Sequence, residues 1–177
     1  SINSRMVDFP LPITLAGSDG QKRRWLTAVG EGQAMAAFAM TEAEAGSDVS
    51  ALRTTARKDG DGYVLDGAKT LISNAGIADV YTVFAATDPA KGAKGISCFI
   101  VEALAPGLSF TKAQVLSAPH PLGEISLQGC RVPASSRVGK EGDGFRIGMM
   151  TLDRLRPTVA AAACGMAARA LAEARAH

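Results

Sequence analysis

The sequence has few aromatic residues and almost no net charge. Aromatic residues make up 5% of the 177 positions and apolar residues 47%, so a globular core has to be built mainly from Ala, Val, Leu and Ile. The 19 basic and 17 acidic residues are spread along the chain, apart from the short cluster Lys22-Arg23-Arg24. This distribution does not predict a stripe that binds duplex nucleic acid.

Cysteines and long apolar runs are also scarce. Cys98, Cys130 and Cys164 are far apart and odd in number, which argues against a disulfide framework or a zinc site, and no metal is expected. Reducing, cytoplasmic surroundings fit best, or the mitochondrial matrix in a eukaryote. No segment approaches the roughly 18 to 20 apolar residues of a membrane span, and the N-terminus lacks a signal-peptide pattern. The sequence therefore predicts a soluble protein with no membrane partner.

The length favours one full-sized domain with appendages. Residues 18–21 read SDGQ, which has the form of a capping box, and Trp25 and Val29 follow on one face, so a helix is expected up to Gly30.

Residues 35–140 alternate short β-prone runs with turn residues, which is typical of antiparallel β-structure, and a small sandwich or barrel is expected. A hairpin is predicted around the turn at 59–62, and Asp66-Gly67 is taken as a second turn. The further predicted strands are 69–73, 79–87, 96–102, 115–119 and 125–133, with 88–95 as a hairpin loop.

Residues 141–177 predict one long helix. Phe145, Met149, Leu152 and Leu155 repeat at helical spacing, and the Ala-rich stretch after Pro157 offers small residues where another helix could approach. Pro157 is expected to kink the helix rather than end it. So long a helix needs partners, and more chain is expected beyond it.

Three blocks of sequence, in this order and spacing, resemble the acyl-CoA dehydrogenase family. They read FAMTEAEAGSD (38–48), GYVLDGAKTLISNAG (62–76) and GDGFRIGMMTLDRLRP (142–157), and ISCFIVE and CRVP lie between the last two. The resemblance implies an α+β chain: an antiparallel β-barrel or sandwich middle domain, flanked by an N-terminal helix and by the long first helix of a C-terminal helical domain. It implies that residues 1–34 are the end of an N-terminal helical domain, residues 35–140 the middle β domain, and residues 141–177 the start of the C-terminal helical domain. FAD would lie between the β domain and the C-terminal helices.

The resemblance also implies which residues contact FAD. Donors near the flavin ring stabilise the charge that arrives with a hydride, and the Thr41 hydroxyl and backbone would supply them. Gly46 and Ser47 would approach the pyrophosphate, because glycine admits positive φ and a Ser hydroxyl can donate. Ser73 would lie near flavin N5. The full set of expected cofactor residues is Phe38, Met40, Thr41, Gly46, Ser47, Leu71, Ile72 and Ser73.

Leu71 departs from the family, which often has an aromatic residue covering the flavin face at this position. An aliphatic side chain there would change solvent access and redox tuning. Without the resemblance, Leu71 and Ile72 would simply be core residues, and Thr41 would only end a strand.

Ser47, Asp153 and Arg156 are the expected substrate residues, with the guanidinium near the phosphates or amides of CoA. A solvated helix face is the alternative for Asp153 and Arg156. Dehydrogenation also needs a carboxylate base, and no residue of this sequence is assigned to it. His120 is assigned no role.

The expected function is FAD-dependent α,β-dehydrogenation of an acyl-CoA thioester, a step of fatty acid metabolism. The expected partners are acyl-CoA, an electron-transfer flavoprotein and further copies of the chain in a homodimer or homotetramer. Two alternatives stay open: a flavin oxidase or monooxygenase on the same fold, and a non-catalytic module.

Overall fold

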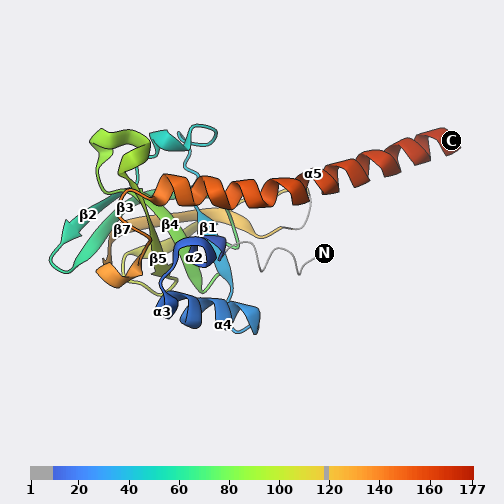
Figure 1. The fold of residues 1–177 in the computed structure, drawn as a ribbon. Coiled ribbons are helices and arrows are strands. Elements are labelled where there is room, and N and C mark those ends of the chain that lie inside the picture. Colours follow the sequence, from blue (N-terminus) through green and yellow to red (C-terminus); the bar gives the residue numbers. More distant parts are fainter. Residues whose placement is uncertain (1–9, 118–119) are drawn as a thin grey trace.

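The computed structural model describes residues 10–117 and 120–177. Short helical segments come first, a mostly antiparallel sheet follows, and one long helix comes last (Figure 1). The helical elements are α2 (Leu11–Ala16), α3 (Asp19–Gln21), η1 (Lys22–Leu26), α4 (Thr27–Gly30), η2 (Val49–Ala51), η3 (Pro89–Gly95), η4 (Ala134–Ser136) and α5 (Gly144–Ala176). The strands are β1 (Ala36–Ala39), β2 (Thr55–Asp59), β3 (Gly62–Ser73), β4 (Val80–Ala86), β5 (Ile96–Glu102), β6 (Leu108–Ala113), β7 (Leu122–Pro133) and β8 (Arg137–Val138). The predicted α+β class is confirmed.

The predicted N-terminal helix and its cap are confirmed. The Ser18 Oγ accepts from the Gln21 backbone N–H at 3.3 Å, and the Ser18 N–H donates to the Gln21 side-chain oxygen at 2.9 Å. These two bonds satisfy N–H groups that the first turn of a helix cannot pair. The helix continues through η1, which is π-helical, into α4, and it buries Trp25 and Val29.

The strands form one sheet in the order β6-β7-β3-β2-β4-β5-β8, with β1 paired to β4 off this path. Most neighbours are antiparallel, as predicted, but β1 and β4 run parallel, and so does a single pair between β2 and β4. The expectation of a purely antiparallel domain is therefore wrong at β1. The chain travels through the whole β2–β3 hairpin before it returns as β4, and such a long crossover is what parallel neighbours require.

The hairpin at residues 59–62 is confirmed, since Asp59 pairs with Gly62 and the strands run antiparallel from there. The predicted turn at Asp66-Gly67 is wrong, because β3 runs straight through it. Its pairing with β7 shifts register between Leu65 and Gly67, which is a β-bulge. Gly67 has φ +150, and a Cβ there would lie 2.7 Å from the Thr54 Cα. The glycine marks a bulge and a close backbone approach rather than a chain reversal.

Two further local predictions need correction. The loop at 88–95 joins antiparallel strands as expected, but most of it is a 3₁₀ helix. Of the strand expected at 115–119, residues 115–117 form no strand, and residues 118 and 119 lie outside the described part of the chain. The strand before β7 is β6 instead, and it is easily missed because its residues are nearly all exposed.

Two apolar cores lie on opposite faces of the central strands. In β4, Tyr81, Val83 and Ala85 point into the core enclosed by the curved sheet, and Val80 and Phe84 point into the core beneath the helices. Because both faces are covered, β4 is buried along its whole length and reads as a continuous apolar run. Ile13 of α2 and Ile147 of α5 close the second core. Figure 1 shows the N-terminal helices and α5 together over this side of the sheet.

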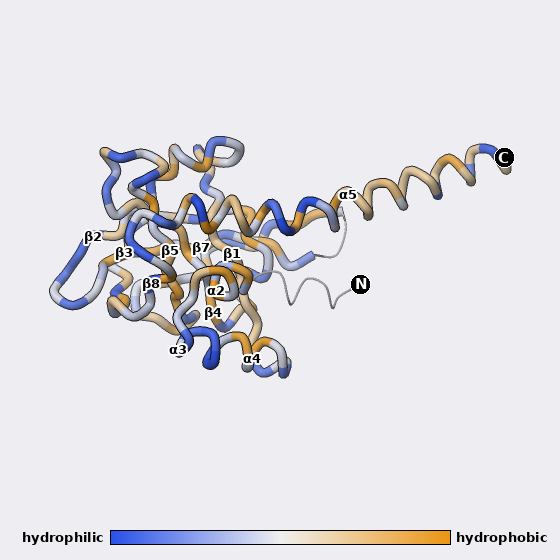
Figure 2. The backbone as a smooth tube through the Cα atoms, in the orientation of Figure 1, coloured by the Kyte–Doolittle hydropathy of each residue, from blue (hydrophilic) through white to orange (hydrophobic). Residues whose placement is uncertain are grey.

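Helix α5 packs only through its beginning. Gly144, Ile147, Gly148 and Thr151 are buried, and every residue after Leu155 is exposed. The helix continues through Pro157, as expected, and it changes direction along its length and extends well beyond the rest of the molecule (Figure 1). Apolar residues are interspersed along this projecting part (Figure 2). In the described part of the chain, no helix combines the length and the hydrophobicity that crossing a membrane requires.

Candidate functional site

The end of β1 lies beside the last third of β3. The Thr70 N–H donates to the Thr41 carbonyl at 3.0 Å, and the Asn74 side-chain amide donates to the Ala36 carbonyl at 3.0 Å. Two segments that are thirty residues apart in the sequence are therefore neighbours. One is 38–41 and the other is 71–73, so the structure brings together most of the expected flavin residues.

Phe38 packs against β4, and Met40 connects this region to the start of α5. The Phe38 ring is half-buried and lies against the Phe84 ring, with centroids 4.9 Å apart. Met40 is buried, and a Cβ added at Gly148 would lie 2.5 Å from its terminal methyl group. The glycine therefore lets α5 approach the end of β1 closely. Sheet and helix meet at these residues.

A buried ion pair fixes the strand end. The Lys69 ammonium lies 2.7 Å from the Glu42 carboxylate and donates to the Met40 carbonyl at 3.2 Å. The Lys69 side chain is fully buried and that of Glu42 is 8% exposed. The carboxylate also accepts from the Arg53 N–H at 2.6 Å, and from the N–H and hydroxyl of Thr54 at 3.0 and 2.6 Å. Glu42 thus ties β1, β3 and the segment before β2 together.

Burial and charge act differently on the two partners. Desolvation raises the pKa of Glu42, but the Lys69 charge and the hydrogen bonds from Lys69, Thr54 and Arg53 outweigh it, so the pKa lies below its usual value. Desolvation lowers the pKa of Lys69 to about 8, because the attraction of Glu42 offsets it only in part. Protein donors stabilise the buried carboxylate well, whereas burial disfavours the charged form of the ammonium.

Sequence reasoning did not assign Glu42 or Lys69 any role, although both lie inside the blocks that carry the resemblance. A Glu directly after a buried strand and a Lys within an apolar strand are each unfavourable alone. The sequence did contain one signal for an ion pair, since these two unfavourable residues have opposite charges. The remaining bonds of Glu42 come from the backbone N–H groups of Arg53 and Thr54 and from the Thr54 hydroxyl, and the sequence alone does not show that these groups lie beside it.

Gly46 and Ser47 lie in an exposed turn between the end of β1 and η2. Gly46 does not adopt a positive φ, so the expectation that its backbone requires glycine is wrong. A Cβ at this position would meet nothing within 4 Å in the described structure. Ser47 is exposed, and its hydroxyl is open to solvent.

Leu71, Ile72 and Ser73 differ in their surroundings. Leu71 has φ +55 and is 54% exposed, so the view that it is simply core is wrong, whereas Ile72 is buried at 1% exposure. The Ser73 hydroxyl lies 2.8 Å from the Nε2 of His120, within hydrogen-bond distance. His120, which sequence reasoning left without a role, is therefore next to an expected flavin residue.

Asp153 and Arg156 form an ion pair with each other at 2.9 Å on the exposed part of α5. Their side chains are 63% and 70% exposed, and no contact in the described structure joins them to the other expected site residues. The structure itself favours the solvated helix face that the sequence left open as their alternative.

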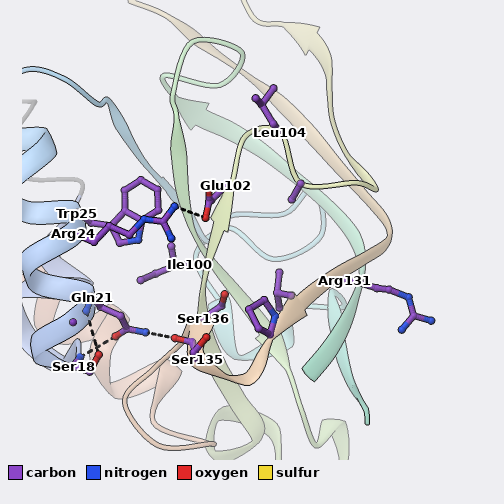
Figure 3. A pocket seen from close by; sticks show the side chains of 14 residues that line it. Ser18, Gln21, Arg24, Trp25, Ile100, Glu102, Leu104, Arg131, Ser135 and Ser136 are labelled. Atoms are coloured by element: carbon purple, nitrogen blue, oxygen red, sulfur yellow. Dashed lines mark hydrogen bonds and ion pairs between the residues drawn. The ribbon is translucent and has the colours of Figure 1, made fainter. Parts of the chain in front are cut away.

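A separate cavity lies away from these residues. A cavity of about 520 Å³ separates the helix α3–η1 from β5 and β7, and its lining includes Trp25, Ile100 and Val132 (Figure 3). Several of its polar side chains are already paired: Arg24 with Glu102 at 2.8 Å, and Gln21 with the Ser135 carbonyl at 2.8 Å. None of the expected flavin residues lines it. Size alone does not make it the site, because few polar groups converge there unpaired.

The sequence profile described as "Acyl-CoA dehydrogenase, middle domain" matches residues 37–130, which is more than half of the chain. The chain belongs to the acyl-CoA dehydrogenase family. A short-chain specific acyl-CoA dehydrogenase of Megasphaera elsdenii is 45% identical over 166 residues, which are 92% of this chain and 43% of that protein.

Solved structures agree with this membership. The butyryl-CoA dehydrogenase of Megasphaera elsdenii superposes with a TM-score of 0.80 at 40% identity, over 84% of this chain and 40% of that one. A protein described as an FAD-dependent dehydrogenase superposes with a TM-score of 0.81 at 36% identity, over 84% of this chain and 41% of that one. This acyl-CoA dehydrogenase family chain thus spans about two fifths of the length of these relatives.

Proposed function

We propose that the chain carries the middle, flavin-binding part of an FAD-dependent acyl-CoA dehydrogenase, which removes two hydrogens from the α and β carbons of an acyl-CoA thioester. The observation that carries this proposal is the junction of β1 and β3. Segments 38–41 and 71–73, which match family blocks, lie side by side there and are fixed by the Glu42–Lys69 pair. A solved relative named as an FAD-dependent dehydrogenase supports the choice of cofactor.

The residues at this junction fit a flavin. Leu71 offers an exposed apolar side chain, the half-buried Phe38 ring lies on the adjacent strand, and the Thr41 and Ser73 hydroxyls lie near them in sequence. Flat aromatic ligands are held by such apolar surface together with a few placed donors. The open turn at Gly46 and Ser47 would admit the pyrophosphate, because no side chain fills the space above the glycine.

In this proposal Phe38 and Leu71 would form the wall against the ring, the buried Met40 and Ile72 would support that wall, and Thr41 and Ser73 would donate hydrogen bonds to the ring. FAD, when bound, supplies the hydride acceptor. His120 orients the Ser73 hydroxyl through their 2.8 Å contact. The buried pair Glu42–Lys69 keeps the two strands in register, so that the donors stay aimed in the same direction.

The remaining parts of the proposal rest on the family resemblance. Ser47, Asp153 and Arg156 are proposed for CoA, and no residue is proposed as the base. The proposed partners are an electron-transfer flavoprotein and further copies of the chain, and the domain limits stay at 34/35 and 140/141. The three free cysteines support a reducing, cytoplasmic location.

The test is the visible absorption spectrum of the purified protein after incubation with FAD and gel filtration. A retained flavin band that acyl-CoA bleaches anaerobically supports the dehydrogenase. A retained band that bleaches and returns in air supports the oxidase alternative, which the aliphatic Leu71 keeps open. A band that never forms contradicts the flavin site and supports the non-catalytic module.

A further inference from the structure

Leu71 adopts a backbone conformation that leucine avoids. Its φ of +55 lies in the left-handed region, where a Cβ meets the following carbonyl, and only Gly, Asn and Asp visit this region readily. Its side chain is also 54% exposed. Neither the backbone nor the side chain of Leu71 favours this arrangement, so neighbouring groups must maintain it.

The strained leucine sits in a β-bulge. Lys69 of β3 pairs with Ile125 of β7 and Ile72 pairs with Gly123, so two residues of β3 face Glu124 alone. On the other edge of β7, the pairing with β6 also shifts at Glu124. Bulges re-aim side chains next to functional sites, and here the bulge turns Leu71 outward while Ile72 stays in the core.

Gln114 holds this bulge with both ends of its amide. Its side-chain oxygen accepts from the Leu71 N–H at 3.0 Å, and its side-chain nitrogen donates to the Thr70 hydroxyl at 3.0 Å and to the Glu124 carboxylate at 3.1 Å. The Thr70 hydroxyl in turn donates to Glu124 at 3.3 Å. The backbone N–H of Gln114 donates to the Leu122 carbonyl at 2.8 Å, which anchors Gln114 itself.

We propose that Gln114 is a positioning residue that holds the Leu71 bulge in its left-handed form and thereby sets the flavin-facing surface of β3. This inference rests on the proposed function and adds a residue outside the matching blocks to it. Gln114 acts through the backbone: its side chain accepts from the Leu71 N–H and also bonds Thr70 of β3 and Glu124 of β7. Its side chain is not required to touch the cofactor.

The first measurement needs no cofactor. In Gln114→Met, which keeps the side-chain length and removes donor and acceptor, the Leu71 amide should exchange with solvent at least tenfold faster by NMR. Gln128→Met, on an exposed glutamine of neighbouring β7, is the control and should leave that amide unchanged. Unchanged exchange in Gln114→Met overturns the proposal.

The second measurement is FAD affinity with a rescue. Gln114→Met should weaken FAD binding at least tenfold and shift the visible circular dichroism of any flavin that binds. Glycine takes a positive φ without strain, so in a Leu71→Gly background the same substitution should weaken binding less than threefold. A residue that only stabilised the fold would lower affinity equally in both backgrounds, and that result overturns the positioning role.

The two proposals fail in different ways. If the unmodified protein binds no FAD, the proposed function fails, and the flavin part of this inference fails with it, while the exchange measurement still decides whether Gln114 holds the bulge. If the unmodified protein binds FAD and Gln114→Met binds it equally well, the positioning role alone is overturned.

Discussion

The Glu42–Lys69 pair leads to an asymmetric prediction for substitutions that remove one charge. In Glu42→Gln, one carboxylate oxygen becomes an NH₂ group, which donates and cannot accept, so either the Arg53 N–H or the two Thr54 donors lose their acceptor. At least one buried donor is left unpaired, and the buried ammonium loses its counter-charge. Breaking a buried pair on this side should lower the free energy of unfolding by about 3 to 5 kcal/mol.

Lys69→Met should cost much less. The pKa of Lys69 is about 8 against an ordinary 10.5, which means that burying its charge is unfavourable by about 3 kcal/mol even beside Glu42. Methionine removes this cost and fills the same space, while Glu42 keeps its other hydrogen bonds. We expect a change of less than about 2 kcal/mol in either direction, and a double variant no less stable than Glu42→Gln alone.

Urea unfolding at pH 7 with linear extrapolation measures all three variants. Glu102→Gln is the matched control, because Glu102 pairs with Arg24 at 2.8 Å but is 53% exposed, and it should change stability by less than about 1 kcal/mol. The reasoning is refuted if Lys69→Met is more destabilising than Glu42→Gln. It is equally refuted if the double variant is less stable than Glu42→Gln alone.

Three further predictions concern pH, packing and thiol reactivity. The pKa of Lys69 is lower in the folded chain than in the unfolded one, so the unfolded state binds more protons between pH 8 and 10. The free energy of unfolding should therefore rise by about 2 to 3 kcal/mol over this range. Urea unfolding at several pH values should show this rise in the unmodified protein and not in Lys69→Met. Gly144→Ala should lower the free energy of unfolding by about 1 to 3 kcal/mol in the same assay, because its Cβ would lie 2.5 Å from the backbone of β5. Gly165→Ala is the control: its Cβ would meet nothing within 4 Å in the described structure, so this substitution should be neutral or stabilising. A thiol reagent should label Cys164 rapidly in the folded protein and the two buried cysteines only in denaturant, as mass spectrometry would show; rapid labelling of all three would contradict the packing.

The fold was predictable wherever the sequence signal was local. The cap at Ser18 and the hairpin at Asp59–Gly62 depend on residues a few positions apart, and both were found. The turn expected at Asp66-Gly67 failed because glycine serves a bulge as well as a turn, and only the Thr54 backbone packed against it distinguishes the two. The parallel partner of β1 follows from long-range topology, which no local pattern carries.

The candidate site was predictable only as two sequence blocks. Composition and spacing gave no reason to place residue 41 beside residue 70, and the family resemblance supplied that expectation. The buried pair depends on Glu42 and Lys69 meeting across strands, and the strain at Leu71 depends on Gln114 more than forty residues away. Such contacts arise only in the tertiary structure. The preferences of the single residues oppose them, because charged residues avoid burial and leucine avoids positive φ.

The central claim is that the end of β1 and the β3 bulge form the flavin site. Hydrogen-exchange mass spectrometry with and without FAD tests it most directly. The account predicts that peptides spanning 38–48 and 69–76 gain protection when FAD is added. Protection confined to residues 18–25 and 131–136, which line the large cavity, or unchanged exchange throughout the chain, would contradict it.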